Sequence, residues 1–376
     1  MGVSVSLCPH LDGSKIPVVP LGRYVAIEVM VLGAALATVG LATRACVFGE
    51  RGRVARGHVE WSQGTGIGEE LLPRSELSNP PNPAIFEEPA GTFLGMDDEM
   101  LLERVRRQPI TKMKLNKGGS SLSFRVDLAD GSRAAFKPAQ TNFQTIPRKE
   151  VAAYRLNRLL GLNAVPPAAP RKVSREEMFA SLSPESLVYL PRIRAETIFD
   201  PMGKTAGVIM YWVPGIKDSD LDSPAGIHQG LQWLTQGQPI PTDRRSLAAQ
   251  FSQLIVFDFL TSNPDRFSGG NMKISADGSR LLFMDNTMSF FIEPEGNERT
   301  RSTLKRAQRF SRHLYHALDR VSTPTLERIL AQASENDYEI LTPSEIRAVV
   351  ARRDWVKRYI DGLVATYGVR NVLVFP

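Results

Sequence analysis

Cysteine is scarce in this sequence of 376 residues, which contains only Cys8 and Cys46. Both lie near the N-terminus, so the region from residue 94 onward relies on neither a disulfide nor a thiol nucleophile. A region without cysteine folds under either oxidising or reducing conditions, so the cysteine content does not identify the cellular compartment of the protein. Histidine is also rare, because only His228, His313 and His316 occur after residue 93. Any metal bound by this region would be a hard cation held through oxygen rather than zinc.

Long runs of Lys and Arg are missing as well, and so are zinc-finger spacings and the aromatic motifs of RNA-binding domains. No nucleic-acid partner is therefore expected. The formal net charge of +6 is modest for this length and favours anionic partners such as phosphates or a membrane surface. The length and the hydrophobic content of 42% allow a two-lobed enzyme with one catalytic unit and an extension.

One long apolar run is present, YVAIEVMVLGAALATVGLAT at residues 24–43. It is just long enough to span a bilayer as a helix, and Arg23 and Arg44 flank it. We interpret it as a single membrane anchor. A signal peptide cleaved at Ala45 and a buried globular helix are the alternatives. The excess of arginine after the run places the catalytic domain in the cytoplasm by the positive-inside rule, whereas cleavage of a signal peptide would export it.

These features divide the chain into four parts. The parts are an N-terminal tail at 1–23, a transmembrane or signal segment at 24–43, a flexible linker at 44–93 and a catalytic domain at 94–376. The linker is rich in Gly, Pro, Ser and Glu and shows neither helical nor strand periodicity, so little fixed structure is expected there.

The catalytic domain contains patterns of both strands and helices. Residues 122–128 alternate between apolar and polar side chains, which predicts a strand, and the turn at 129–132 leads to a returning strand at 134–137. Other segments predict an amphipathic helix at 97–107 with Met100, Leu101 and Val105 on one side, a helix at 147–161 with Val151, Tyr154, Leu159 and Leu160 buried, a strand at 207–214, a helix at 246–260, and closing helices from Thr323 and Thr342.

Two acidic clusters lie close together in the C-terminal half. Asp265 belongs to the sequence NPDR, Asn271 follows a Gly pair, and Asp285 ends the apolar run LLFM. We interpret 272–284 as a hairpin with an Asp-Gly turn, which would bring these three residues to one end of two strands. One carboxylate could then accept a proton from a hydroxyl, while Asn271 and Asp285 hold Mg²⁺ or Mn²⁺. The alternative is an ordinary loop, since the same residues are turn formers.

Three features lie upstream of these clusters. A loop before the first strand has backbone N–H groups suited to a phosphate. Its residues are Lys117, Gly118, Gly119 and Ser120. Lys137 ends the returning strand and Glu150 lies in the first turn of the next helix, an order that positions nucleotide phosphates in kinases. Taken one at a time, these features have simpler explanations. The loop could be a surface turn, Lys137 could be solvated, and Glu150 could interact only with the helix dipole. Together they predict an α+β, bilobal protein-kinase-like fold with an antiparallel-sheet N-lobe and a mainly helical C-lobe.

The sequence resembles the Four-jointed and Golgi casein kinase family of atypical kinases. The resemblance covers about residues 110–290, and it rests on AFKP at 135–138, EVAAYRLNRLL at 150–160, VPP at 165–167, DFLTSNPDR at 258–266 and FMDN at 283–286. It implies an ATP-dependent kinase. By this resemblance Lys137 binds the nucleotide phosphates, Glu150 orients Lys137, Asp265 is the catalytic aspartate and Asp285 binds metal.

The chain departs from the standard protein-kinase pattern at two points. Asp285-Asn286-Thr287 stands where standard kinases have Asp-Phe-Gly, and the resembled family departs there too. Asn271 lies six residues after Asp265 instead of five, and the Ser268-Gly269-Gly270 loop could absorb the extra residue. Eukaryotic members of that family also work in the secretory lumen with disulfides, which this chain lacks after Cys46.

Three functions are compatible with these observations. The first is an ATP-dependent phosphotransferase that phosphorylates a hydroxyl of a protein or glycan. The second is a phosphoinositide-type lipid kinase, because such kinases share an Asp-Arg-x-x-x-Asn loop and would suit a membrane anchor. The third is a membrane-tethered pseudokinase that only binds, although the intact acidic residues and Lys137 count against it. The basic stretch at 298–313 is interpreted as a solvated helix face, with docking of an acidic substrate as the alternative.

Overall fold

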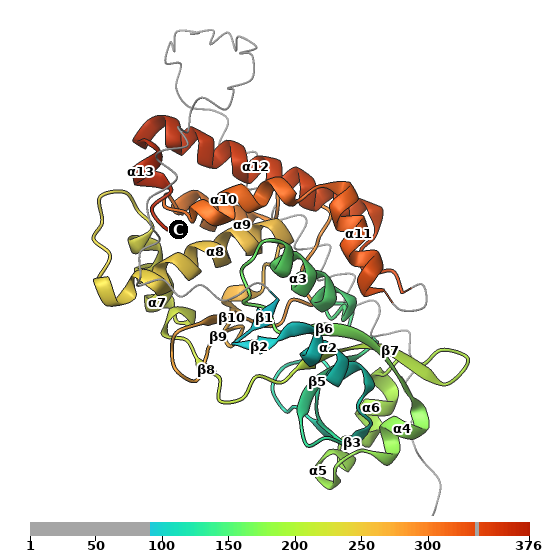
Figure 1. Cartoon of the computed structure of the whole chain (residues 1–376). Helices are drawn as coiled ribbons and strands as arrows, with labels where there is room; N and C mark the ends of the chain where they lie inside the picture. Colours follow the sequence, from blue (N-terminus) through green and yellow to red (C-terminus); the bar gives the residue numbers. More distant parts are fainter. Residues whose placement is uncertain (1–90, 335–337) are drawn as a thin grey trace, which may run out of the picture. The chain divides into compact units, whose positions relative to one another are not determined.

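The computed structural model describes residues 91–334 and 338–376 (Figure 1). The predictions for the tail at 1–23, the apolar run at 24–43 and nearly all of the linker lie outside these residues. None of the helices in the described part combines the length and the apolar character needed to cross a membrane.

The N-lobe is built on a five-stranded antiparallel sheet in the order β3-β4-β5-β7-β6. Its strands are β3 Ile110–Leu115, β4 Phe124–Leu128, β5 Arg133–Pro138, β6 Ala168–Ser174 and β7 Lys204–Tyr211. Strands β4, β5 and β7 occur where alternation or an apolar run predicted them.

Strands β3 and β6 were not predicted, and each has a local reason. The pairing of β3 with β4 shifts between Ile110 and Lys112, so the inward-facing residues of β3 do not alternate strictly. Strand β6 contains Pro170, and a proline at that place in the sequence indicates a loop rather than a strand. Proline is tolerated there because β6 is an edge strand.

Two longer helices accompany the sheet. Helix α2, Asp98–Arg107, follows a short hairpin of β1 Thr92–Phe93 and β2 Met96–Asp97. Helix α3, Arg148–Leu159, confirms the helix expected at 147–161. As predicted, the buried side chains include Leu101, Val105, Val151, Tyr154 and Leu160. Two predictions were wrong: Leu159 is only half-buried, and Met100 is 47% exposed because Leu102 takes the inward position.

Short helices fill the connection between β6 and β7. They are α4 Arg175–Ala180, α5 Pro184–Leu187 and α6 Leu190–Glu196. None is long enough to show a helical period in the sequence, which is why this region could not be assigned beforehand.

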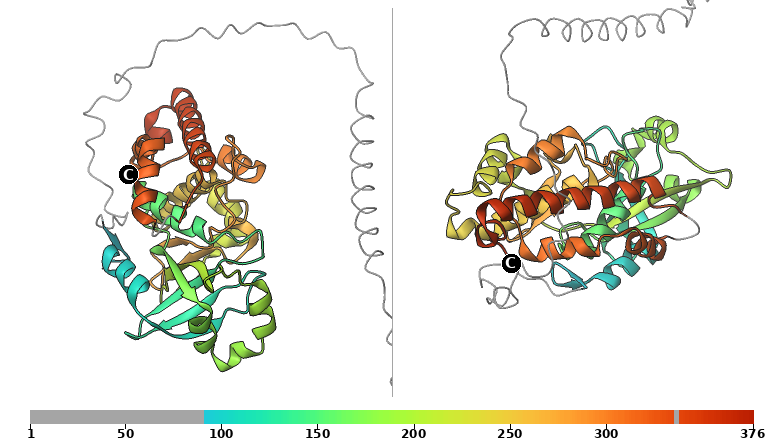
Figure 2. Two further views of the ribbon diagram at one scale, coloured as in Figure 1. Left: turned by 90° about the vertical axis from the view of Figure 1, so that its right-hand side faces the viewer. Right: turned by 90° about the horizontal axis from the view of Figure 1, so that it is seen from above.

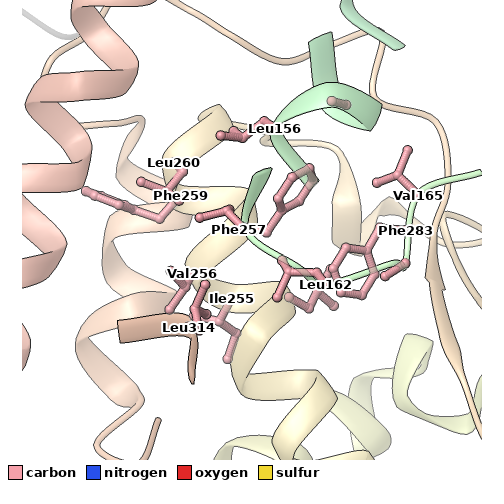
Figure 3. Close-up of a cluster of buried hydrophobic side chains, with 14 of the residues drawn as sticks. Leu156, Leu162, Val165, Ile255, Val256, Phe257, Phe259, Leu260, Phe283 and Leu314 are labelled. Carbon is pink, nitrogen blue, oxygen red and sulfur yellow. The ribbon is translucent and has the colours of Figure 1, made fainter. Parts of the chain in front are cut away.

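The C-lobe is mainly helical and is organised around α8, Arg245–Thr261 (Figures 1 and 2). Most side chains of α8 are buried, because other helices and a small sheet cover it. Figure 3 shows its last two turns within a buried cluster that reaches the N-lobe side, and the labelled residues are Leu156, Leu162, Val165, Ile255, Val256, Phe257, Phe259, Leu260, Phe283 and Leu314. This packing fixes the end of α8, from which the NPDR segment follows.

The remaining elements complete the C-lobe. The helices are α7 Pro224–Trp233, α9 Glu298–Arg306, α10 Arg312–Ala317, α11 Thr323–Ala333, α12 Pro343–Tyr367 and α13 Val369–Val372. The 3₁₀ turns are η3 Asp220–Asp222, η4 Thr242–Arg244, η5 Arg266–Ser268 and η6 Leu318–Arg320. A three-stranded antiparallel sheet has the order β10-β9-β8, with β8 Lys217–Asp218, β9 Met272–Ile274 and β10 Leu281–Phe283.

The basic stretch at 298–313 is two helices rather than one continuous face, because the chain is extended between α9 and α10. Arg299 donates hydrogen bonds to the backbone carbonyls of Pro264 (2.9 Å) and Phe267 (2.8 Å). Arg309 likewise donates to the carbonyl of Trp233 (3.0 Å). Part of the positive charge of this stretch therefore stabilises loops of the C-lobe.

Candidate active site

The hairpin of β9 and β10 brings the two acidic clusters to one end, as its sequence predicted. The strands pair from Leu281 with Ile274 to Phe283 with Met272, and Gly278 in the turn has a φ of 78°. Beyond the last pair, the backbone N–H of Met284 donates to the carbonyl of Asn271 at 2.9 Å. Asn271 and Asp285 therefore leave the hairpin side by side.

Lys137 connects the two lobes. Its ammonium group donates to Glu150 Oε1 at 2.7 Å and to Asp285 Oδ1 at 2.8 Å. Lys137 is only 5% exposed, and Glu150 is 1% exposed. Burial alone would lower the pKa of Lys137, but the carboxylates of Asp285 and Glu150 outweigh it and raise the pKa above its usual range. The lysine is therefore a fixed cation at neutral pH.

The second oxygen of Glu150 is also bound. Glu150 Oε2 accepts hydrogen bonds from the backbone N–H of Asn286 at 3.1 Å and from the Asn286 side-chain amide at 3.2 Å. A buried carboxylate is stable only when its oxygens are satisfied in this way. Asn286, which the sequence did not single out, thus fixes Glu150 from the C-lobe.

Asp285 points toward Lys137 from an unusual backbone conformation. Its φ is 50°, in the left-handed region that few residues other than glycine adopt. Asp285 Oδ1 also accepts a hydrogen bond from the hydroxyl of Thr287 at 2.7 Å. Burial opposes ionisation, but Lys137 and Thr287 together lower the pKa of Asp285 to about 2. The carboxylate is therefore ionised at neutral pH, and its side chain is still 37% exposed to bind a ligand.

Arg266 holds the loops of the site together. It is 1% exposed, and its Nε donates to both carboxylate oxygens of Asp258 at 3.1 Å. Its other nitrogens donate to the carbonyls of Asn271 (2.8 Å) and Met284, and to Asn286 Oδ1 (2.7 Å). Burial raises the pKa of Asp258 to about 6, against the opposing effect of Arg266. One guanidinium group therefore joins α8, the start of β9 and the end of β10.

Asp265 and Asn271 are in direct contact. The side-chain amide of Asn271 donates to Asp265 Oδ2 at 3.0 Å and to the Asp265 carbonyl at 2.9 Å. The extra residue between them is absorbed by Gly269 and Gly270, which have φ values of 102° and 82°. Asp222 in η3 accepts a hydrogen bond from the Gly270 N–H at 2.6 Å and fixes this turn.

An apolar pocket of about 130 Å³ opens beside Glu150 and Asp285. It is lined by Ala135, Glu150, Pro166, Met210, Tyr211, Trp212, Val213, Ile216, Phe283, Met284 and Asp285. Apolar walls with a few charged groups at one end suit a flat heterocyclic base attached to phosphates. The sequence showed 207–214 only as an apolar strand, and nothing in it indicated that the strand's end lines a pocket.

The loop of Lys117 to Ser120 does not line this pocket. Arg192 donates to the Ser120 carbonyl at 2.6 Å, and Asn142 donates to the Ser120 hydroxyl at 3.4 Å. Gly119 has a φ of 89°, which glycine adopts without strain. A phosphate-binding role for Lys117, Gly118, Gly119 and Ser120 stays a prediction.

The oxygen atoms at the end of the hairpin fit a hard divalent cation. Asp285 Oδ1 accepts hydrogen bonds from Lys137 and Thr287, and the Asn271 amide nitrogen donates to Asp265, so Asp285 Oδ2 and Asn271 Oδ1 are the atoms that could hold a cation. Within residues 91–334 and 338–376, no three His, Cys, Asp or Glu side chains gather around a common point. A site with two protein ligands suits Mg²⁺ or Mn²⁺, which keep waters and phosphate oxygens as further ligands.

The β-sheet N-lobe, the helical C-lobe and the Lys137–Glu150–Asp285 contacts define an α+β kinase-like fold. The sequence matches a family model described as the Four-jointed box protein middle domain over residues 96–291, which is more than half of the chain. The chain therefore belongs to the Four-jointed box family. No curated protein sequence gives a significant match.

Solved structures of related fold agree with this assignment. A crystal structure of the Golgi casein kinase has a TM-score of 0.54 and 16% identity, covering 74% of this chain and 79% of that one. The structure of the Golgi casein kinase with Mn and ADP bound has a TM-score of 0.54 and 14% identity, and the match covers 73% of this chain and 78% of that one. The structure of hydra Fam20 with sugar has a TM-score of 0.53 and 16% identity, and the match covers 72% of this chain and 90% of that one. These likenesses confirm the kinase-like fold and the resemblance drawn from the sequence.

Proposed function

We propose that this protein is an ATP-dependent phosphotransferase that transfers the γ-phosphoryl group to a hydroxyl of a protein or glycan. The observation that carries the proposal is the ammonium group of Lys137 held between Glu150 and Asp285 beside an apolar pocket. A cation fixed in that way is suited to bind nucleotide phosphates, while the pocket is suited to the base. The relative with Mn and ADP bound supports this choice of ligands.

The residues have separate roles in the proposed reaction. Lys137 binds phosphate oxygens and Glu150 keeps it in place. A divalent cation at Asp285 and Asn271 would neutralise the charge of the phosphates. Asp265, whose Oδ2 accepts a hydrogen bond from Asn271, orients the acceptor hydroxyl and takes its proton as the phosphoryl group moves to the hydroxyl oxygen and ADP leaves.

The proposal is tested with the full chain, γ-labelled ATP and either Mg²⁺ or Mn²⁺. Proteins, glycans and phosphoinositides are offered as acceptors in separate reactions. Label on a protein or a glycan supports the proposal and decides between those two acceptors. Label on lipid alone would establish the phosphoinositide-kinase alternative, and nucleotide binding without any transfer would establish the pseudokinase alternative.

We further propose that residues 24–43 anchor the protein in a membrane as a single span. The cytoplasmic placement rests only on the arginine excess after the run. The description of one related structure as a Golgi kinase favours the opposite placement, in the secretory lumen, as an alternative. Protease treatment of sealed vesicles distinguishes the two, since a lumenal catalytic domain would be protected until the vesicles are permeabilised.

A further inference from the structure

The first turns of α12 contact the helix that carries Glu150. Thr342 caps α12, and the Glu345 carboxylate accepts a hydrogen bond from the Thr342 N–H at 2.8 Å, which completes a capping box. The same carboxylate of Glu345 accepts two hydrogen bonds from the guanidinium group of Arg148, at 2.7 and 3.0 Å. Arg148 is the first residue of α3 and lies two positions before Glu150.

Lys149, the residue between Arg148 and Glu150, also lies near Glu345. Its ammonium group lies 3.8 Å from Glu345 Oε1 and 4.7 Å from the centroid of the Phe291 ring. Lys149 is buried, so these interactions act in a region of low dielectric. The start of α3 is therefore bound at once to α12 and to the segment that follows Asp285.

Two turns further along α12, Arg352 binds the end of α8, which leads to Asp265, and the segment that follows Asp285. It is fully buried and donates to the carbonyl of Leu260 at 2.7 Å, near the end of α8. It also donates to the carbonyls of Phe291 at 2.8 Å and Glu293 at 2.7 Å. Leu260 precedes Asp265 by five residues, and Phe291 follows Asp285 by six.

We propose that α12 is a positioning helix for the active site, with Glu345 and Arg352 as its positioning residues. The inference rests on the proposed function, because it assigns these residues to the same reaction. Glu345 and Arg352 are seven residues apart and so lie on one face of the helix. That face holds the three segments from which Glu150, Asp265 and Asp285 project.

The physical basis is the number of directional bonds made to each segment. Glu345 fixes α3 by a bidentate ion pair, and such forks define orientation as well as distance. Arg352 fixes backbone carbonyls rather than side chains, so its effect depends little on the sequence of the segments it binds. The Lys137–Glu150 contact is therefore supported by a helix near the C-terminal end of the chain.

The variant that tests this is Glu345→Gln in the full chain. Glutamine still completes a capping box, so α12 keeps its N-terminal cap, but it cannot hold Arg148 and Lys149 by charge. The matched control is Asp319→Asn, which removes an exposed ion pair between η6 and Lys357 of α12. Arg148→Lys serves as the conservative variant, since it keeps the cation and loses the fork.

Two measurements are made on each variant. The first is hydrogen exchange of the backbone amides in α3. The second is the steady-state kinetics of transfer from ATP, with kcat and KM determined separately. We expect Glu345→Gln to exchange several-fold faster in α3 and to lose about tenfold or more in kcat/KM, a typical cost of removing a residue that orients a functional group. Arg148→Lys should be intermediate, and Asp319→Asn should match the parent in both.

The outcomes separate the two proposals. Parent-like exchange in α3 of Glu345→Gln, or an equal change in Asp319→Asn, would overturn the role of α12. Absence of nucleotide binding and transfer in the parent protein would instead overturn the proposed function, while the exchange measurement would still decide whether α12 orders α3. Should Glu345→Gln fold poorly, Arg148→Lys tests the same ion pair from the α3 side, and parent-like exchange in α3 of that variant would likewise overturn the role of α12.

Discussion

Replacing Glu150 by glutamine tests the centre of the proposed site with almost no change of shape. In the parent, one oxygen of Glu150 accepts from Lys137 at 2.7 Å, and the other accepts from two N–H groups of Asn286 at 3.1 and 3.2 Å. Glutamine offers only one acceptor atom. Whichever way its amide turns, an NH₂ group must face either the Lys137 ammonium or the Asn286 donors.

The size of the effect follows from these contacts. If the amide oxygen faces Lys137, two buried donors of Asn286 lose their acceptor, and leaving a buried polar group unsatisfied costs about 1–3 kcal/mol. If the amide oxygen faces Asn286 instead, the charge-assisted hydrogen bond from Lys137 is lost, which costs about 1.5–3 kcal/mol, although Asp285 still pairs with the lysine. Either orientation of the amide therefore costs about 1–3 kcal/mol, which corresponds to roughly 5- to 150-fold less of the ordered site, at about 1.4 kcal/mol per factor of ten.

The assay compares kcat/KM for transfer from ATP at 25 °C and the midpoint of thermal unfolding. Glu150→Gln should lower kcat/KM by at least about fivefold and lower the midpoint by several degrees, at about 2–4 °C per kcal/mol for a domain of this size. Glu298→Gln is the control, because Glu298 is exposed and its ion pair with Arg301 contributes about 1 kcal/mol or less. If Glu150→Gln retains the kcat/KM of the parent, the ion pair does not order the site and the reasoning is refuted.

Three further predictions follow from the same contacts. Asp265→Asn should keep the melting temperature and nucleotide affinity while transfer falls by about two or more orders of magnitude, as measured by single-turnover kinetics; an Asp265 that only closes a turn would leave the rate unchanged. Excess chelator should abolish transfer and added Mn²⁺ or Mg²⁺ should restore it, and full activity in chelator would contradict a metal at Asp285 and Asn271. Burial lowers the pKa of Lys149 to about 8, against the carboxylates of Glu345 and Glu293, so between pH 8 and about 10.4 the unfolded chain binds more protons and stability rises with pH. Denaturant unfolding at several pH values should therefore show that the free energy of unfolding of the parent rises relative to that of Lys149→Met between pH 8 and about 10.4. A difference between the two proteins that stays constant with pH would contradict the lowered pKa of Lys149.

Much of the fold could be predicted because its main elements have clear periods. The alternation in β4 and the apolar spacing in α8 are each explained by one buried face or by complete burial. The region between β6 and β7 could not be predicted, because its helices have no more than about two turns each. Helices this short depend on tertiary packing rather than on their own sequence. Strand β6 was missed because Pro170 is permitted only by its position at the edge, which the sequence does not reveal.

The candidate site shows the same division. Lys137, Glu150 and Asp285 could be chosen from their order along the chain, because a strand, a helix and a hairpin each place one of them. Asn286 could not be assigned, since its value lies in contacts with Glu150, which is 136 residues away in the sequence. The lining of the pocket was equally hidden, because it depends on where the chain turns after β7 rather than on any residue pattern.

The backbone conformation at Asp285 explains why a turn-forming residue and the proposed metal-binding carboxylate coincide there. In a regular strand, Asp285 and Asn286 would point to opposite faces. The site requires Asp285 to reach Lys137 and Asn286 to reach Glu150, two partners that are bonded to each other. A φ of 50° at Asp285 provides that geometry, and apart from glycine it is best tolerated by Asp and Asn. Only Asp also supplies an ionised oxygen for a cation, so the turn-forming tendency and the proposed metal-binding role are both properties of one residue, and Asp285→Asn should preserve the turn while weakening the binding of Mn²⁺.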